Sequence, residues 1–182
     1  MRKALETLVV FLALLILGYF YLAPNSGLAL LGDTTHLISE GGDASTAPFQ
    51  YHVVLETARR YPTRLLFGTL FTPQLNAPYG LGLWVPMFER LSVVLLSPFF
   101  TLEGLATAFV WMSMTMNGLV LYWLGRRRGW PFAIALALGI CWAFNPYTRA
   151  RSISHFALVG IFYLPSAFLG LDLLRNAKRK RE

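Results

Sequence analysis

Long apolar runs recur along this chain, and they constrain its fold more than any other feature. Five stand out, at about residues 4–23, 83–100, 102–125, 130–147 and 156–174. A helix of about 20 apolar residues is long enough to cross the hydrocarbon core of a bilayer. Hydrophobic residues make up 55% of the 182 positions and charged residues 14%, against roughly 25% in soluble domains. The sequence therefore predicts an all-α integral membrane protein.

The distribution of basic residues decides which runs cross. If all five crossed, the basic segments 126–128 and 178–181 would lie on the side opposite to Arg2 and Lys3. Basic residues near membrane ends are biased toward the cytoplasm, so that topology is disfavoured. If 83–100 does not cross, all of these basic residues lie in the cytoplasm. The net charge of +7 is therefore interpreted as an orientation signal, and no nucleic-acid partner is expected.

The run 83–100 also argues against crossing by its own composition. It carries Glu89 and Arg90 near its middle, and a charge at mid-bilayer costs at least about 2.5–3.5 kcal/mol. An interfacial or re-entrant helix tolerates these residues better. We therefore predict four transmembrane helices with both termini cytoplasmic, at 4–23, 102–125, 130–147 and 156–174. A cleaved signal peptide is the alternative for the first run, but that run is long for one.

This topology gives one membrane domain, 1–182, with a long outer loop at 24–101 and a basic tail at 175–182. Within the loop, residues 48–61 are predicted to form a surface helix, because Pro48 suits a first helical turn and Pro62 stops the helix. The segment that follows, up to about residue 84, is rich in turn-forming Pro, Asn and Gly.

The segment GDTTHLISEGGDAST, residues 32–46, holds three of the nine acidic residues. Asp33 and Asp43 each follow a glycine and precede a small residue, which is also typical of ordinary Asx-turns. A carboxylate near a low-dielectric surface can have its pKa raised toward neutrality and can then act as a general base, or it can bind a cation. The spacing matches no strong zinc or calcium motif.

The segment NPYTRARSISHFAL, residues 145–158, is predicted to be a short connection between two crossings, with a turn at Asn145-Pro146. Arg149 and Arg151 lie here on the outer face, where arginine is disfavoured, and His155 follows. Arginine offers a planar fork of donors that suits phosphate, such as the head of a lipid. The alternative is contact with native headgroups or with loop acids, and for His155 an interfacial position at a helix start.

The order of these parts resembles a known family. One crossing leads to an acidic loop beginning GD and a surface helix, then to NAPYG, a crossing that ends in GRRRG and a crossing that ends in NPYTRARSISH. This is similar to the N-terminal part of bacterial GT-C type membrane glycosyltransferases, which use polyprenyl-phosphate-linked sugars. The resemblance implies a catalytic carboxylate, Asp43 or Asp33, which in some members helps to hold a divalent cation. It also implies donor-phosphate binding by Arg149, Arg151 and His155.

The resemblance implies transfer of a sugar from a polyprenyl-phosphate donor to an acceptor at the outer face of the bacterial cytoplasmic (inner) membrane. The chain departs from that family because its enzymes have many more crossings than four. We therefore expect either a missing C-terminal portion or a reduced homologue that needs a partner subunit. The alternative function is a non-catalytic membrane scaffold or lipid-binding subunit.

Overall fold

The computed structural model describes residues 2–26, 43–67, 70–72, 77–79, 87–154 and 160–179. The described residues form eight helices and two short strands. The helices are α1 (Arg2–Ser26), α2 (Asp43–Arg60), α3 (Pro62–Phe67), α4 (Met87–Leu96), α5 (Leu102–Arg127), α6 (Phe132–Ala143), α7 (Pro146–Ser154) and α8 (Tyr163–Arg179). The strands β1 (Leu70–Thr72) and β2 (Ala77–Tyr79) pair antiparallel in the segment that the sequence identified as rich in turns. The predicted helical character of the chain is therefore confirmed.

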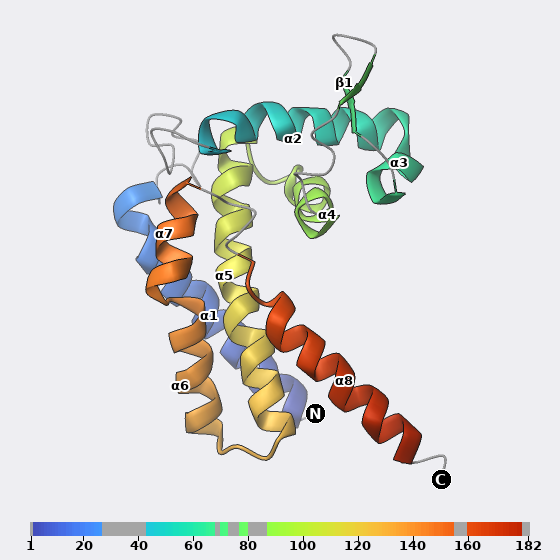
Figure 1. Ribbon diagram of the computed structural model, residues 1–182. Coiled ribbons are helices and arrows are strands. Elements are labelled where there is room, and N and C mark those ends of the chain that lie inside the picture. Colours follow the sequence, from blue (N-terminus) through green and yellow to red (C-terminus); the bar gives the residue numbers. More distant parts are fainter. Residues whose placement is uncertain are drawn as a thin grey trace.

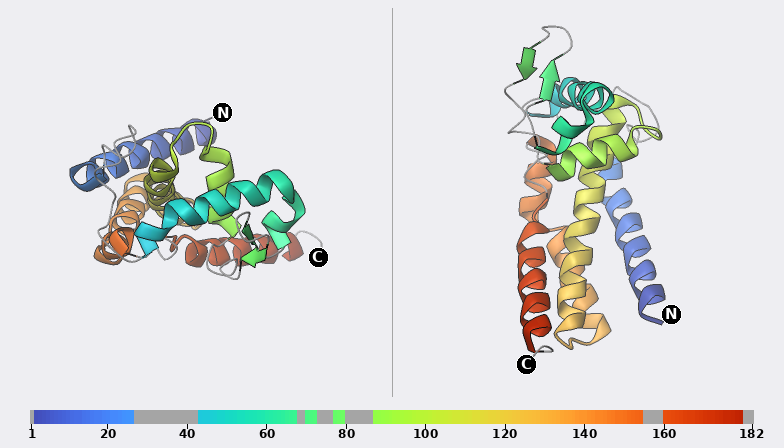
Figure 2. Two further views of the ribbon diagram at one scale, coloured as in Figure 1. Left: turned by 90° about the horizontal axis from the view of Figure 1, so that it is seen from above. Right: turned by 90° about the vertical axis from the view of Figure 1, so that its right-hand side faces the viewer.

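The helices form a stem and a layer across one end of it (Figures 1 and 2). We call α1, α5, α6 and α8 the stem, and α2 and α4 the cap layer. The first residues of α1 and the last residues of α8 lie at the end of the stem farthest from the cap layer (Figure 1). α7 extends from α6 toward the start of α2 (Figure 1). The start of α1, the end of α5 and the end of α8, which all carry basic residues, therefore lie at the end of the stem opposite to the cap layer.

α5 is the central helix, and its two halves pack into two different cores. Its first half buries Leu105, Phe109 and Met114 against α2 and α4. Its second half buries Leu119 and Tyr122 against α1 and α6. A helix that is apolar on most of its circumference must be covered on all of those sides, which is why five other helices, α1, α2, α4, α6 and α8, meet it.

α5 and α6 approach until their backbones touch. A Cβ atom built on Gly139 would lie 2.8 Å from the carbonyl oxygen of Gly118, closer than real Cβ contacts occur. Among the small residues of α6, Ala135 and Gly139 are buried, whereas Ala133 and Ala137 are exposed. Small residues on one face of a helix permit this close packing, and in α6 that face carries Ala135 and Gly139.

The cap layer contains the segments that were predicted to lie on the membrane surface. α2 contains the predicted surface helix 48–61 except for its last residue. It begins five residues earlier, so that Pro48 lies inside it, and Pro62 begins α3. α4 has 10 residues, about 15 Å, and is too short to cross a hydrocarbon core of about 30 Å. It packs against α2 and α5.

Two helices among the described residues are long and apolar enough to cross a membrane, at Lys3–Tyr21 and Gly104–Arg127. Only 17% of the first window is buried inside the protein, so most of the apolar side chains of α1 are exposed. An exposed apolar surface of this extent favours association with a membrane or a partner. The second window is 78% buried, so its apolar character also fits a core helix.

The predicted crossings at 130–147 and 156–174 do not appear as single long helices. α6 has 12 residues, about 18 Å, and ends before Asn145-Pro146. The described part of the last run, residues 160–174, is helical only from Tyr163, where α8 begins. Two of the four predicted crossings, 4–23 and 102–125, thus coincide with described helices that are long and apolar enough to cross a membrane.

Within the predicted connection at 145–158, residues 146–154 form helix α7, which the sequence analysis did not predict. The Asn145 side-chain oxygen accepts a hydrogen bond from the Thr148 amide at 3.0 Å, which makes Asn145 the N-cap. Pro146 occupies the first helical position, where its missing N–H group is not needed. The pair that was interpreted as a turn therefore also starts a helix.

Candidate functional site

Three of the five predicted site residues, Asp43, Arg149 and Arg151, belong to helices that meet at the cap end of the molecule. Asp43 is the first residue of α2, and only its backbone is described; Asp33 and His155 lie outside the described residues. α2 contacts α7, the helix that carries Arg149 and Arg151, and both views show α7 beside the start of α2 (Figures 1 and 2). The fold therefore brings together two segments that are about 100 residues apart in the sequence.

Each of the two arginines lies over an aromatic ring. The Arg149 guanidinium carbon is 5.7 Å from the centre of the Tyr21 ring, near the end of α1. The Arg151 guanidinium carbon is 5.4 Å from the centre of the Tyr147 ring, one turn earlier in α7. Cation–π contact fixes the position of a guanidinium group while its N–H donors lie in the guanidinium plane.

The helical conformation of α7 changes what the two arginines can do together. Residues two positions apart on a helix differ in direction by about 200°, so Arg149 and Arg151 lie on opposite sides of α7. In an irregular connection both could have reached one phosphate group. In α7, Arg149 extends toward α1 and Arg151 stays beside its own helix.

Thr148, between these residues, adds a buried polar atom to the junction. Its side chain is fully buried, and its hydroxyl oxygen has no hydrogen-bond partner among the described residues. A buried hydroxyl group without a partner is unfavourable by about 1–3 kcal/mol. A bound polar group could satisfy this oxygen.

Sequence reasoning did not assign a site role to the polar cluster beneath α2. The Tyr51 hydroxyl donates a hydrogen bond of 2.8 Å to a carboxylate oxygen of Glu89, joining α2 to α4. Glu89 is 4% exposed and Arg90 is 7% exposed. The sequence signal was present, because both charged residues interrupt an apolar run, but it was used only to exclude a crossing.

The electrostatics of this cluster follow from its burial. Burial raises the pKa of the Tyr51 phenol well above its usual value, and the adjacent Glu89 raises it further. Burial lowers the pKa of the Arg90 guanidinium, and Glu89 opposes that shift. Because Glu89 is nearly inaccessible to solvent, the cluster is suited to joining the two cap helices rather than to binding a substrate.

No group of three or more His, Cys, Asp or Glu side chains that could hold a metal ion occurs among the described residues. Of the acidic segment 32–46, residues 43–46 belong to the described part of the chain, whereas Asp33 lies outside it.

The chain matches none of the family models, curated proteins or solved structures with which we compared it. A functional proposal for the protein therefore depends on its own residues and their packing.

Proposed function

We propose that the chain, alone or as part of a longer protein, is a glycosyltransferase that uses a polyprenyl-phosphate sugar at the outer face of the bacterial cytoplasmic membrane. The observation that carries the proposal is the contact between α2 and α7. It brings the helix that begins at Asp43 beside the helix that carries Arg149 and Arg151. A carboxylate and guanidinium groups are the two kinds of group that such a transfer needs.

The proposed topology has four crossings, formed by α1, α5, α6 with α7, and α8, and it places the cap layer outside. Support comes from the basic residues at the far end of the stem. α1 begins with Arg2 and Lys3, α5 ends with Arg126 and Arg127, and α8 ends in a basic segment. Basic residues near membrane ends favour the cytoplasmic side, so this end would face the cytoplasm.

In the proposed reaction, Asp43 or Asp33 removes the proton from an acceptor hydroxyl group. The acceptor oxygen bonds to the anomeric carbon of the donor while the bond from that carbon to the phosphate oxygen breaks. The polyprenyl phosphate leaves with the electron pair, and arginine stabilises the negative charge that develops on it. A single displacement of this kind inverts the anomeric configuration.

The test is transfer of a radiolabelled sugar in vesicles that contain the purified protein. A panel of polyprenyl-phosphate hexoses and pentoses is supplied as donors, with a crude polysaccharide or glycolipid fraction as acceptor. The double substitution Asp33→Asn with Asp43→Asn should abolish transfer, because the base is lost while side-chain size is conserved. Glu56→Gln is the matched control, since Glu56 also lies on α2 but pairs with Arg59 and Arg60 at 3.1 Å.

Single substitutions then assign the phosphate contact. Because Arg149 and Arg151 point away from each other, Arg149→Gln and Arg151→Gln should differ in their effect on transfer, with one of them reducing it at least about tenfold. Full activity in the double aspartate variant would exclude this mechanism. If the wild type and this variant both insert normally but the wild type transfers no sugar from any donor, the result would instead favour the scaffold function.

A further inference from the structure

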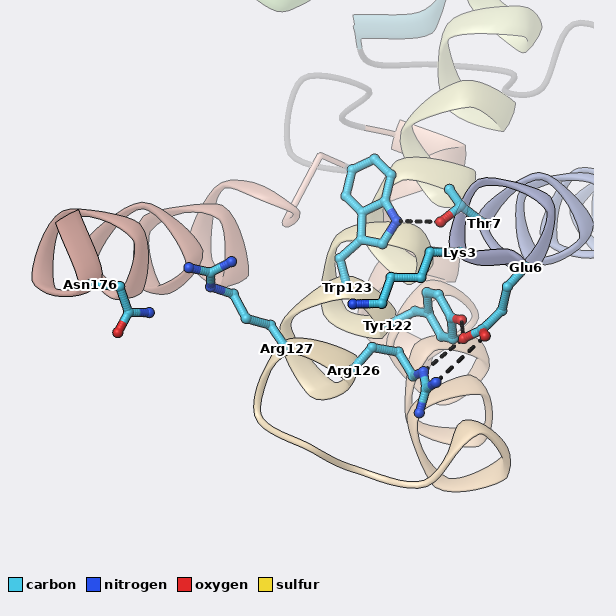
Figure 3. A pocket seen from close by; sticks show the side chains of 8 residues that line it. All are labelled: Lys3, Glu6, Thr7, Tyr122, Trp123, Arg126, Arg127 and Asn176. Carbon is cyan, nitrogen blue, oxygen red and sulfur yellow. Dashed lines mark hydrogen bonds and ion pairs between the residues drawn. The ribbon is translucent and has the colours of Figure 1, made fainter. Parts of the chain in front are cut away.

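A pocket lies at the end of the stem opposite to the cap layer. It has a volume of about 500 Å³ and is formed by the start of α1, the end of α5 and the end of α8 (Figure 3). Pockets of 300–1,000 Å³ are typical of small-molecule sites. None of the residues proposed for glycosyl transfer lines it.

The lining of this pocket is positively charged. Lys3, Arg126 and Arg127 contribute three cations, and Glu6 contributes one carboxylate. Glu6 is already engaged, because the Arg126 Nε atom donates to it at 2.7 Å and the Tyr122 hydroxyl also donates to it. No ion pair of Lys3 or Arg127 is found with any residue that the structure describes. The pocket therefore has an excess of two positive charges.

The walls of the pocket are held in place by contacts between distant helices. The Trp123 indole N–H donates to the Thr7 hydroxyl oxygen at 3.3 Å, which ties α5 to α1. Arg128 donates two hydrogen bonds to the Asp172 carboxylate, at 3.1 and 3.2 Å, which ties the end of α5 to α8. Figure 3 shows Arg127 extending toward Asn176, with the Lys3 side chain between Trp123 and Tyr122. The three cationic side chains thus extend from helices that are held together by hydrogen bonds.

We propose that this pocket binds the phosphate group of an anionic glycerophospholipid headgroup. Lys3 and Arg127 supply the two unneutralised charges, and Glu6 orients Arg126 as a third donor. Charged groups of this kind make strong hydrogen bonds to phosphate oxygens. Basic pockets between helices at a membrane surface are suited to anionic headgroups, and tryptophan and tyrosine prefer the same depth. The exposed apolar side of α1 would lie beside the acyl chains.

The experiment measures lipid binding to the purified full-length chain in micelles of a non-ionic detergent. Phosphatidylglycerol and phosphatidylcholine are titrated separately, and bound lipid is counted by native mass spectrometry. Phosphatidylglycerol should bind the wild type at least about tenfold more tightly than phosphatidylcholine, because the latter has no net charge. The double substitution Lys3→Gln with Arg127→Gln should weaken phosphatidylglycerol binding roughly 10-fold to 30-fold.

The matched control is Arg60→Gln with Arg64→Gln, which removes the same charge from the other end of the molecule. It should leave phosphatidylglycerol binding within about twofold of the wild type, because these residues do not line the pocket. Equal weakening by both double variants would overturn the proposal, since it would indicate attraction to net charge alone. Circular dichroism checks that every variant is folded.

A second arm separates lipid from free phosphate. Inorganic phosphate and glycerol phosphate, each at millimolar concentration, are added in competition with phosphatidylglycerol. Retention of the lipid supports a headgroup site that includes contacts with the acyl region. Complete displacement by inorganic phosphate would overturn the lipid assignment. Failure of the wild type to prefer phosphatidylglycerol over phosphatidylcholine would overturn the site altogether, whatever the result for glycosyl transfer.

Discussion

Two groups of one tyrosine, one glutamate and one arginine join helices at opposite ends of the molecule. The cap trio is Tyr51, Glu89 and Arg90, and the stem trio is Tyr122, Glu6 and Arg126. In each trio the tyrosine hydroxyl donates to the glutamate carboxylate. Their surroundings differ: Glu89 is 4% exposed, whereas the side chains of Glu6 and Arg126 are 22% and 36% exposed.

Burial decides what the same three groups do in each trio. In the cap trio, removal of one partner leaves the others charged or polar inside the protein, which is strongly unfavourable. In the stem trio, water can replace a lost partner, so the contact contributes little to stability. The cap trio is therefore a structural joint, while the stem trio borders a pocket that remains open to a ligand.

The largest effect is expected from Glu89→Ala. This substitution leaves the buried Arg90 without its adjacent carboxylate and the Tyr51 hydroxyl without its acceptor. We expect a loss of about 3–5 kcal/mol in the free energy of unfolding, measured by denaturant titration of the protein in detergent. Glu56→Ala, on the solvent-facing side of α2, should have a far smaller effect. Similar losses for both variants would contradict the distinction drawn from burial.

The next effect is expected from Tyr51→Phe. The substitution keeps the ring, which is fully buried, but removes the hydroxyl that donates to Glu89 at 2.8 Å. Hydrogen bonds to charged groups contribute about 1.5–3 kcal/mol, so the variant should be less stable by about that amount at neutral pH. The same denaturant titration measures it.

The pH dependence of this variant gives an independent check. The pKa of the Tyr51 phenol is raised well above its usual value near 10, because it is buried and lies beside Glu89. The folded protein thus retains a proton that the unfolded chain loses. The stability that Tyr51 contributes is complete below about pH 10 and is lost as the pH rises above it. The difference in stability between the wild type and Tyr51→Phe should therefore shrink above about pH 10, and a constant difference would argue against this environment.

A buried but uncharged contact should have a smaller effect. The Asn117 side-chain oxygen on α5 accepts a hydrogen bond of 2.7 Å from the Phe162 amide, at the start of α8. Asn117→Leu leaves this buried N–H group unpaired, and we expect a loss of about 1–2 kcal/mol. Asn176→Leu, at an exposed position of α8, is the control. A loss for Asn117→Leu as large as that for Glu89→Ala would show that charge is not what distinguishes the cap trio.

Part of this fold could be predicted from local sequence patterns. The helices α1 and α5 follow from long apolar runs, and the short α4 follows from Glu89 and Arg90 within such a run. The start of α7 was also readable, because Asn followed by Pro suits the N-cap and the first helical position. It was interpreted as a turn because the same pair is typical of turns.

Other features depend on contacts between distant segments and have no local pattern. The approach of Gly118 to Gly139 is one example, since either glycine alone is uninformative. The pocket is another, because its walls come from residues near 3, 123 and 176. The predicted site is intermediate: α2 and α7 meet as the proposal needs, but the helical form of α7 separates the directions of Arg149 and Arg151.

The smallest effect on stability is expected from Glu6→Gln, and this variant separates the two trios most directly. The amide oxygen of glutamine can still accept from the Tyr122 hydroxyl, and the partly exposed Arg126 can be solvated by water. Thermal unfolding in detergent should thus be close to that of the wild type. Lipid binding should become tighter. Loss of the Glu6 charge leaves the pocket with one more net positive charge, so phosphatidylglycerol should bind about fivefold more tightly. A large loss of stability would make the stem trio a structural joint like the cap trio. Unchanged stability with tighter binding would show that the partial exposure of Glu6 and Arg126 makes them part of a binding site.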